Sequence, residues 1–297
     1  MNRITFAVRN VWDKARKALR RPGTLGFYVR TYLGGRASVP APDVYVVSYP
    51  KCGRTWLRAI LCGYLSRIGV EQSPRDAFRL RLPEGRVLMF DHDGGNWVPA
   101  PRRADRLRFD AERYAGRRVV FLVRDPRDVL VSSWYHLRYR ERIYRGTLDA
   151  FAMEPLVGIG KVLAFMRLWL EQRGVPAAFL LLRYEDLHAD AAGAAARVLE
   201  FAGCRVDRAH LEAAVDAARF EKMKRREAAA GDAEEPWRRP GVAGNEASMK
   251  VRRGQVGGYR EEFSPQGLAR VEAVMCEQMP PELDYGERGT DAGKNRD

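Results

Sequence analysis

The chain has 297 residues, 46% of them hydrophobic, which is enough to bury the core of one large domain. Lys and Arg (52) outnumber Asp and Glu (38), and the net charge of +14 favours an anionic ligand or surface. The four cysteines lack the spacing of a zinc site and the density of a disulfide scaffold, and no apolar stretch reaches the roughly 20 residues of a membrane span. The composition thus excludes a disulfide-rich secreted scaffold and an integral membrane protein, and it predicts a cytoplasmic protein.

Residues 1–40 are expected to form a basic, helical N-terminal extension. Residues 1–36 contain nine basic residues and one acidic residue, and apolar residues recur every three or four positions until Pro22-Gly23. This amphipathic pattern has two interpretations that the sequence leaves open. One is a helix that docks on the domain with a solvated basic face, and the other is a peripheral contact with the inner membrane surface.

The next segments alternate between strand and helix patterns. An apolar, β-branched run from Val44 passes through a donor-rich turn into a helix, and a second short strand covers 85–93 and ends at His92-Asp93. A third strand is expected at 117–123. It is followed by a helix that has Asp125 as its N-cap and Pro126 in its first turn.

The alternation continues through the rest of the chain. A helix at 158–173 precedes a buried strand at 178–187, and helices follow at 191–202 and 207–218. The polar stretch 225–249 has no periodicity and is expected to be a lid or a disordered loop. We therefore predict an α/β domain over 41–287, with a central parallel sheet flanked by helices on both faces, and a disordered tail at 288–297. Ligands of such sheets lie at the carboxyl ends of the strands.

The turn after the first strand, in SYPKCGRTWL, has the properties of an anion site. Backbone N–H groups and a helix N-terminus converge there. Lys51 precedes Gly53, however, whereas the P-loop of nucleoside triphosphatases places its lysine after the second glycine. The segment instead resembles the Tyr-Pro-Lys-Ser-Gly-Thr-Thr-Trp loop of sulfotransferases that use 3'-phosphoadenosine 5'-phosphosulfate (PAPS). The resemblance implies that PAPS is bound by Lys51, Cys52, Gly53, Arg54, Thr55 and Trp56, although Cys52 and Arg54 replace the common Ser and Thr.

Four further segments extend the resemblance over roughly 44–263 and imply a P-loop-like sulfotransferase fold. VVFLVRDPRDVLVSSWYH implies that Arg124 and Ser132 grip the 3'-phosphate, and RYEDL implies that Tyr184 approaches the nucleotide. ARFEKMK is similar to the segment that places an aromatic ring, here Phe220, against the adenine opposite Trp56. VRRGQVGGYREEFS resembles the C-terminal phosphate-binding segment and implies further 3'-phosphate contacts by Arg252, Arg253 and the backbone of Gly254.

Sulfuryl transfer moves negative charge onto the bridging oxygen of the leaving 5'-phosphate and requires the acceptor to lose a proton. A cation must therefore face that oxygen, and Lys51 is our candidate. For the base we choose His92, by its position at a strand end and by its resemblance to the catalytic histidine of the family. The family's Lys-Thr-His context is here Phe90-Asp91-His92, which leaves no cation at position 90. The scheme requires no metal.

Two other classes of function remain as alternatives. A nucleotide-dependent kinase would need magnesium ligands and a lysine after the glycines of the loop. A basic adaptor for membranes or nucleic acid would explain the charge but would leave His92 and the nucleotide motifs without a role. For the leading function we expect a small-molecule, glycan or lipid acceptor and no nucleic acid partner. Its pocket is expected within 62–116, 136–160 and 225–250, with Trp97, Trp134 and Tyr139 as candidate contacts.

Overall fold

The computed structural model describes residues 41–72, 78–97, 102–230, 240–242 and 244–285. The predicted N-terminal extension (1–40) and the predicted tail (288–297) lie outside the described residues. Among the described residues, no helix combines the length and the apolar character needed to cross a bilayer.

The centre of the described chain is a five-stranded sheet with the order β2-β3-β1-β4-β5. Its strands are β1 (Val44–Ser48), β2 (Arg79–Arg81), β3 (Val87–Asp91), β4 (Arg118–Val123) and β5 (Ala178–Arg183). β1 lies in the middle with every residue buried, which explains its uninterrupted apolar sequence. Four strands run parallel, with Val46 of β1 opposite Phe90 of β3 and Val120 of β4. The predicted parallel sheet is thus confirmed.

Two details of the sheet differ from the sequence prediction. The edge strand β2 is antiparallel to β3 and was not predicted, because three residues are too few to show a periodic pattern. The strand predicted at 178–187 ends at Arg183, and the helix α8 begins at Tyr184. The acidic pair Glu185-Asp186 lies in the first turn of this helix, where the dipole favours negative charge.

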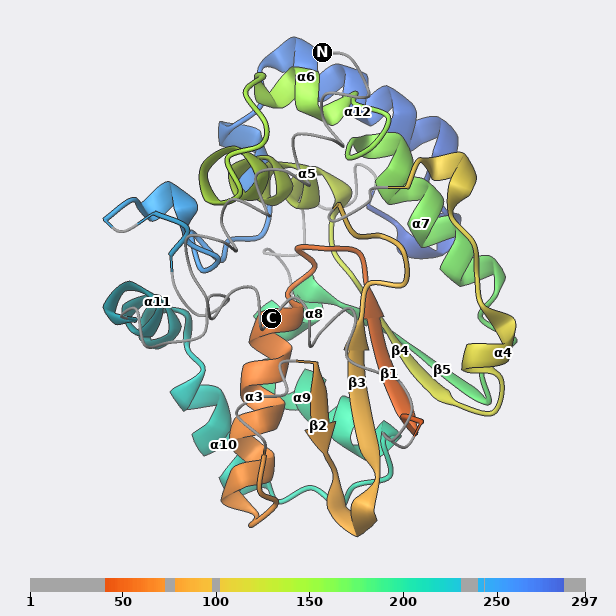
Figure 1. Cartoon of the computed structure of the whole chain (residues 1–297), viewed down its shortest axis with the longest axis vertical. Helices are drawn as coiled ribbons and strands as arrows, with labels where there is room; N and C mark the ends of the chain where they lie inside the picture. Colours follow the sequence, from red (N-terminus) through yellow and green to blue (C-terminus); the bar gives the residue numbers. More distant parts are fainter. Residues whose placement is uncertain (1–40, 73–77, 98–101, 231–239, 243, 286–297) are drawn as a thin grey trace, which may run out of the picture.

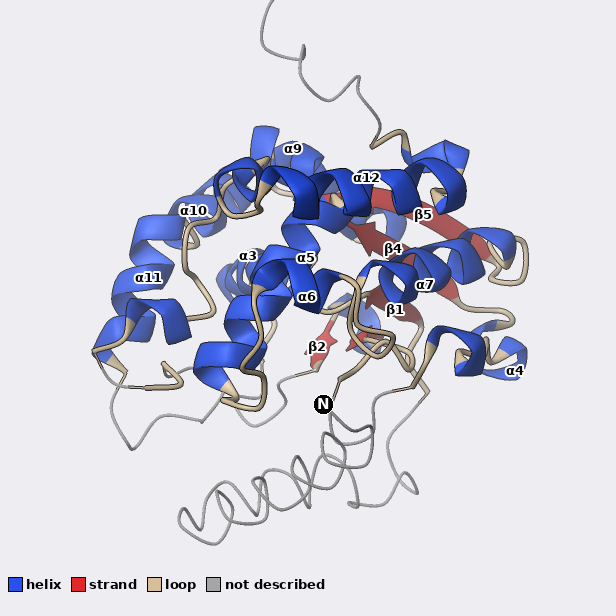
Figure 2. Ribbon diagram, turned by 90° about the horizontal axis from the view of Figure 1, so that it is seen from above, coloured by secondary structure: helices blue, strands red, loops and turns tan. Residues whose placement is uncertain are grey.

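Helices cover both faces of the sheet, as predicted. The helices are α3 (Arg54–Arg67), α4 (Ala111–Tyr114), α5 (Pro126–Tyr135), α6 (Leu148–Ala152), α7 (Ile159–Glu171), α8 (Tyr184–Ala189), α9 (Ala191–Phe201), α10 (Arg208–Ala217), α11 (Phe220–Ala229) and α12 (Pro265–Gln278). The helices α3, α8, α9 and α10 pack against one another and form one group. The helices α5, α6, α7 and α12 form a second group. Figures 1 and 2 show α3 and α9 on one side of the sheet and α7 on the other.

Three local features near the sheet's carboxyl edge were only partly visible in the sequence. Asp125 caps α5 by accepting a hydrogen bond from the Arg127 backbone, as predicted. The chain after α5 continues as a π-helical turn, η4 (His136–Arg140). Residues 225–229, predicted to be part of an aperiodic loop, instead complete α11, while 231–239 and 243 lie outside the described residues.

The strand order places a topological switch between β1 and β4. The chain leaves β1 toward β3 on one side and then crosses to β4 on the other side. The turns that follow β1 and β4 therefore diverge at the carboxyl edge of the sheet, the usual ligand position in open α/β sheets. Lys51 follows β1 and Arg124 follows β4, so both predicted anion-binding residues lie at this switch.

Candidate active site

The turn between β1 and α3 exposes the helix N-terminus to an anion. Lys51 and Gly53 both have positive φ, 76° and 94°, so the backbone reverses sharply before the helix. The Gly53 carbonyl accepts the first helical hydrogen bonds from Trp56 and Leu57. A side chain at Gly53 has no room, because its Cβ would lie 2.4 Å from the Tyr184 ring. Gly53 thus brings the turn against Tyr184.

Lys51 lies among several positive charges. Its side chain is partly buried, and burial, followed by the nearby charge of Arg140, lowers its pKa to about 7. Arg124 and Arg252 also lower this pKa, whereas the carboxylate of Glu227 raises it. A group of cations that destabilise one another in this way is complementary to a multiply charged anion.

Arg124 joins three segments that are far apart in the sequence. Its guanidinium donates to the carbonyl of Gln255 at 2.8 Å and to that of Lys51 at 3.4 Å, and it lies 3.5 Å from the Asp128 carboxylate. The guanidinium carbon is also 4.2 Å from the centre of the Tyr184 ring. The buried Nε of Arg124 has no hydrogen-bond partner among the described residues. One donor thus remains for a ligand.

Tyr184 and Gly254 form the second junction of the site. The Tyr184 hydroxyl donates to the Gly254 carbonyl at 3.2 Å, which ties the start of α8 to the C-terminal segment. Gly254 has φ of 65°, and a Cβ there would lie 2.4 Å from the Phe220 ring. The structure therefore brings together four separate predicted segments, represented by Gly53, Tyr184, Phe220 and Gly254.

The two aromatic residues predicted to stack on adenine contact different parts of this junction. Trp56 makes edge contacts with Tyr184 and His188, at centroid distances of 6.0 and 6.3 Å, and its buried indole N–H has no partner among the described residues. Phe220 begins α11 and packs against Gly254. The stacking of adenine between the two rings stays a prediction.

Arg252 and Arg253 are held by acidic residues. Arg252 pairs with Glu262 at 3.1 Å and lies 3.7 Å from the centre of the Tyr135 ring. Arg253 pairs with Glu261 at 3.0 Å and with Glu262 at 3.3 Å. A contact with a 3'-phosphate would therefore compete with these carboxylates. Ser132, the other predicted phosphate ligand, lies partly exposed on α5, and its role also stays a prediction.

Two side chains of the predicted loop take positions that the motif does not reveal. Cys52 is completely buried in the core, and burial raises its thiol pKa to about 12, which disfavours the reactive thiolate. The guanidinium of Arg54 lies over the Phe78 ring, with 5.8 Å between its central carbon and the ring centre. Thr55 follows in the first turn of α3 and is exposed.

His92 lies directly after β3 and has a defined tautomer. Its Nδ1 donates to the Ser48 carbonyl at 2.8 Å, so Nδ1 carries the proton and Nε2 is the acceptor atom. The Asp91 carboxylate accepts from the backbone of His92 and Asp93, and it pairs with Arg113. Burial, with the charge of Arg54, places the His92 pKa well below its usual value, so the ring is neutral at pH 7. A neutral imidazole with a free Nε2 is suited to act as a general base.

The loop after His92 is held in place by contacts with large side chains. Lys161 donates to the Asn96 carbonyl at 3.1 Å, and burial followed by Arg102 lowers its pKa to about 8. Trp97 donates to the Tyr49 hydroxyl at 3.2 Å and is only 4% exposed. Trp97, expected as a candidate acceptor contact, is therefore a core residue. Trp134 and Tyr139 are partly exposed, and their rings lie 5.8 Å apart.

Two buried carboxylates of the site were not among the predicted site residues. Glu227 accepts from the backbone N–H groups of Lys250 and Val251, at 2.8 and 2.9 Å, and from Arg140 at 3.1 Å. Asp128 accepts from the backbone of Gly257 and Tyr259, at 2.8 and 3.1 Å. Partners so far apart in the chain form no local motif. The only signals for these carboxylates in the sequence were a glutamate late in α11 and an aspartate in the first turn of α5.

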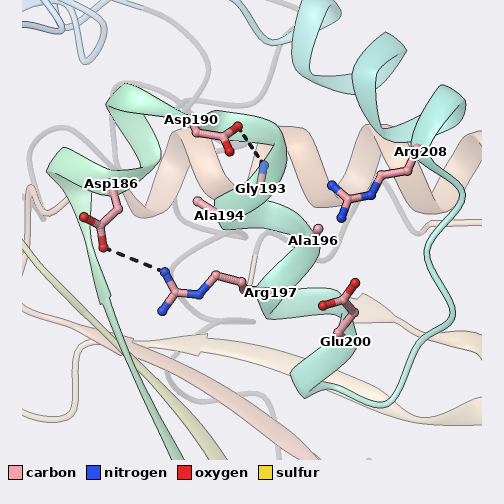
Figure 3. Close-up of a pocket in the computed structure, with 8 residues that line it drawn as sticks. All are labelled: Asp186, Asp190, Gly193, Ala194, Ala196, Arg197, Glu200 and Arg208. Atoms are coloured by element: carbon pink, nitrogen blue, oxygen red, sulfur yellow. Dashed lines mark hydrogen bonds and ion pairs between the residues drawn. The ribbon is translucent and has the colours of Figure 1, made fainter. Parts of the chain in front are cut away.

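A separate pocket lies among α8, α9 and the start of α10 (Figure 3). Its lining mixes acidic and basic side chains, among them Asp186 and Arg197 at 3.9 Å, and Asp190, which caps α9. None of the predicted site residues lines this pocket. The mixed charge contrasts with the cationic surroundings of Lys51, so we place the candidate active site at the sheet edge.

Comparisons with known proteins agree with this fold. Residues 41–280 match the model of the sulfotransferase domain family. Cytosolic sulfotransferase 17 of Arabidopsis thaliana is 27% identical over 261 residues, covering 80% of this chain and 74% of that protein.

Two solved structures share the fold. Mouse sulfotransferase SULT7A1, crystallised in complex with PAP, superposes with a TM-score of 0.57 at 20% identity, covering 81% of this chain and 85% of its own. A retinol dehydratase in a complex with retinol and PAP gives a TM-score of 0.58 at 16% identity, covering 88% and 87%. The fold is therefore that of these enzymes, while their differing names show that fold alone leaves the acceptor open.

Proposed function

The chain belongs to the sulfotransferase domain family, and from this premise we propose that it transfers a sulfuryl group from PAPS to a hydroxyl or amine of an acceptor. The observation that carries the proposal is the junction at Arg124, where the turn after β1, the end of β4 and the C-terminal segment meet. The arabidopsis relative is named a cytosolic sulfotransferase and the mouse neighbour was solved with PAP. We extend both the cytoplasmic location and the nucleotide to this protein.

The residues at the junction fit a nucleotide with two phosphate-bearing ends. The unpaired Nε of Arg124 offers a donor, and the turn at Gly53 adds the backbone N–H groups of a helix N-terminus. Burial is the main cause of the lowered pKa of Lys51, and the positive charges of Arg140, Arg124 and Arg252 lower it further, so these surroundings attract an anion. We assign the 5'-phosphosulfate to the turn at Lys51 and Gly53, and the 3'-phosphate to Arg124, Ser132 and the segment at Gly254.

In the proposed reaction Lys51 stabilises the leaving group. The bond between sulfur and the bridging oxygen of the 5'-phosphate breaks while the acceptor oxygen bonds to sulfur, and the released product is adenosine 3',5'-bisphosphate. Negative charge grows on the bridging oxygen, and the Lys51 ammonium with the N–H groups of the turn compensates it. A bound donor also raises the pKa of Lys51, which keeps the ammonium charged during the reaction.

His92 takes the acceptor proton. The ring is neutral, and its Nε2 is the free acceptor because Nδ1 is engaged by Ser48. The proton therefore passes from the acceptor hydroxyl to Nε2 as the new bond to sulfur forms. The resulting imidazolium is close to several cations, so it loses its proton to solvent readily after product release.

One calorimetric titration tests the assignment of the nucleotide. We expect adenosine 3',5'-bisphosphate to bind with micromolar or tighter affinity, and ATP with magnesium to bind at least tenfold more weakly. Arg124→Ala removes the residue that joins the three segments and is expected to abolish measurable bisphosphate binding. Arg205→Ala, at an exposed arginine in the connection between α9 and α10, is the matched control. Equal affinity for ATP would instead favour a kinase.

A further inference from the structure

The carboxylate of Asp91 and the guanidinium of Arg113 form an ion pair beside the proposed base, and we call this pair the clamp. We propose that the clamp positions His92 for catalysis and keeps its imidazole in the tautomer that has an unprotonated Nε2. Asp91 and Arg113 are then positioning residues, because they act through the base and not on the donor or the acceptor. This inference rests on the proposed function, which takes His92 as the base.

The Asp91 carboxylate holds the backbone at the base. Its Oδ1 accepts from the backbone N–H of His92 at 2.6 Å and from that of Asp93 at 3.1 Å. Asp93 has a φ of 41°, in the left-handed region that is uncommon for residues other than glycine. The Gly95 N–H donates to the His92 carbonyl at 2.8 Å. The backbone therefore turns sharply at the base, and the Asp91 carboxylate supplies hydrogen bonds that hold this turn.

The other oxygen of Asp91 accepts from Arg113, whose side chain is oriented by two aromatic rings. Arg113 lies in α4, and its guanidinium carbon is 5.2 Å from the centre of the Tyr45 ring and 5.3 Å from that of Tyr114. These two rings make an edge contact at a centroid distance of 4.9 Å. Asp91 faces the same side of the sheet as Tyr45, because Met89 lies opposite Tyr45 and Asp91 is two residues further along β3. The clamp is thus fixed by both the sheet and α4.

The clamp and the carbonyl of Ser48 act on the base together. The Ser48 carbonyl accepts from the His92 Nδ1 at 2.8 Å, and this hydrogen bond keeps the proton on Nδ1. The bond requires the His92 backbone to stay where the Asp91 carboxylate holds it. A neutral histidine side chain without such a partner prefers to carry its proton on Nε2, and Nε2 then cannot accept the proton of the acceptor. Loss of the clamp would therefore displace the reacting nitrogen and also protonate it.

The far end of the loop that carries the base has anchors of its own. Lys161 donates to the Asn96 carbonyl at 3.1 Å, and Trp97 donates to the Tyr49 hydroxyl at 3.2 Å. Neither of these contacts involves the clamp. A substitution in the clamp should therefore disturb the base while the rest of the loop stays in place.

Nitrogen-15 NMR of the histidine side chains tests this inference at about pH 8, where the His92 ring is neutral. His92→Ala identifies the signals of the base. We expect the Nδ1–H tautomer in the wild type, and we expect Asp91→Ala to convert about half or more of the population to the Nε2–H tautomer. Arg113→Met should give a smaller shift in the same direction, and Arg113→Lys, which retains the charge, should restore most of the wild-type tautomer. Arg173→Met, at an exposed arginine paired with Glu282, is the matched control and should leave the tautomer unchanged.

Calorimetry with adenosine 3',5'-bisphosphate on the same preparations reports folding and the donor site. The affinity of the clamp variants should stay within about threefold of wild type. If Asp91→Ala does not fold, Asp91→Asn and Arg113→Met decide instead. A wild-type His92 in the Nε2–H tautomer, or an unchanged tautomer in the folded variants of both clamp residues, would overturn the inference. A wild-type protein that fails to bind the nucleotide would instead refute the proposed function.

Discussion

The donor side and the acceptor side of the active site are built in different ways. On the proposed donor side, the turn at Gly53 and the segment 250–254, here called the strap, are positioned through backbone atoms and through glycines that leave no space for a side chain. On the acceptor side, the loop after His92 is positioned by side chains, such as Lys161 on Asn96 and Trp97 on Tyr49. If these assignments are correct, nucleotide binding depends on local backbone geometry, whereas acceptor choice depends on individual side chains from separate elements. Single substitutions on the two sides should therefore have separable effects.

The largest separable effect is expected for the base. His92→Ala should lower kcat about 10²- to 10⁴-fold, the usual contribution of a positioned general base, while bisphosphate affinity stays within about threefold of wild type. Radiolabelled sulfuryl transfer and calorimetry measure the two quantities. His210→Ala, an exposed histidine paired with Asp207, is the control. Full activity of the His92 variant would show that His92 is not the base, and the assignment of the acceptor side would then be wrong.

Lys51 is expected to give the next largest effect, this time from the donor side. Lys51→Ala should lower kcat about 10²- to 10³-fold, as for other groups that stabilise charge in the transition state. Lys222→Ala, at a partly exposed lysine paired with Asp216, should leave kcat unchanged.

The pH profile sharpens the assignment of Lys51. Its ammonium must be charged, and its pKa in the free protein is about 7, so kcat/KM should fall as the pH rises above about 7. In kcat the same fall should move to higher pH, because bound donor anions raise the pKa of Lys51. Fully active Lys51→Ala protein, or a kcat/KM that keeps rising through pH 9, would contradict the assignment.

The smallest effect is expected at the buried pair that anchors the strap. Glu227→Gln keeps the shape of the side chain but weakens its acceptors for Arg140 and for the backbone of Lys250 and Val251. We expect about a tenfold loss of bisphosphate affinity, measured by calorimetry, with kcat at saturation within about threefold of wild type.

Two controls separate positioning from general destabilisation at Glu227. Glu227→Asp retains the charge and should recover part of the affinity, and the exposed substitution Glu212→Gln on α10 should change neither quantity. Thermal unfolding of each variant shows whether the domain remains folded. A variant that is folded and binds the nucleotide normally would show that the strap does not depend on this pair.

The fold was largely predictable because its core elements are long and periodic. The apolar sequences of β1 and β4 correctly predicted buried strands. α7, α9 and α10 begin and end close to their predicted limits, and α5 begins after its predicted cap, Asp125. The antiparallel edge strand β2 was missed because it is short. α11 was missed because its polar last turn is held by Glu227, through contacts with distant residues rather than through a local pattern.

The sequence by itself determined the α/β class, the family resemblance and the donor motif. These features depend on residues that are adjacent in the chain, such as those of a strand, a tight turn and the first turn of a helix. Only the tertiary structure decided which side chains are available. It buried Cys52 and Trp97 in the core and paired Arg252 and Arg253 with glutamates. It also joined Glu227 to Arg140 and brought Arg54 and Lys250 within electrostatic range of His92. Burial and charge interactions depend on distance in space, and the order of residues along a chain does not record that distance.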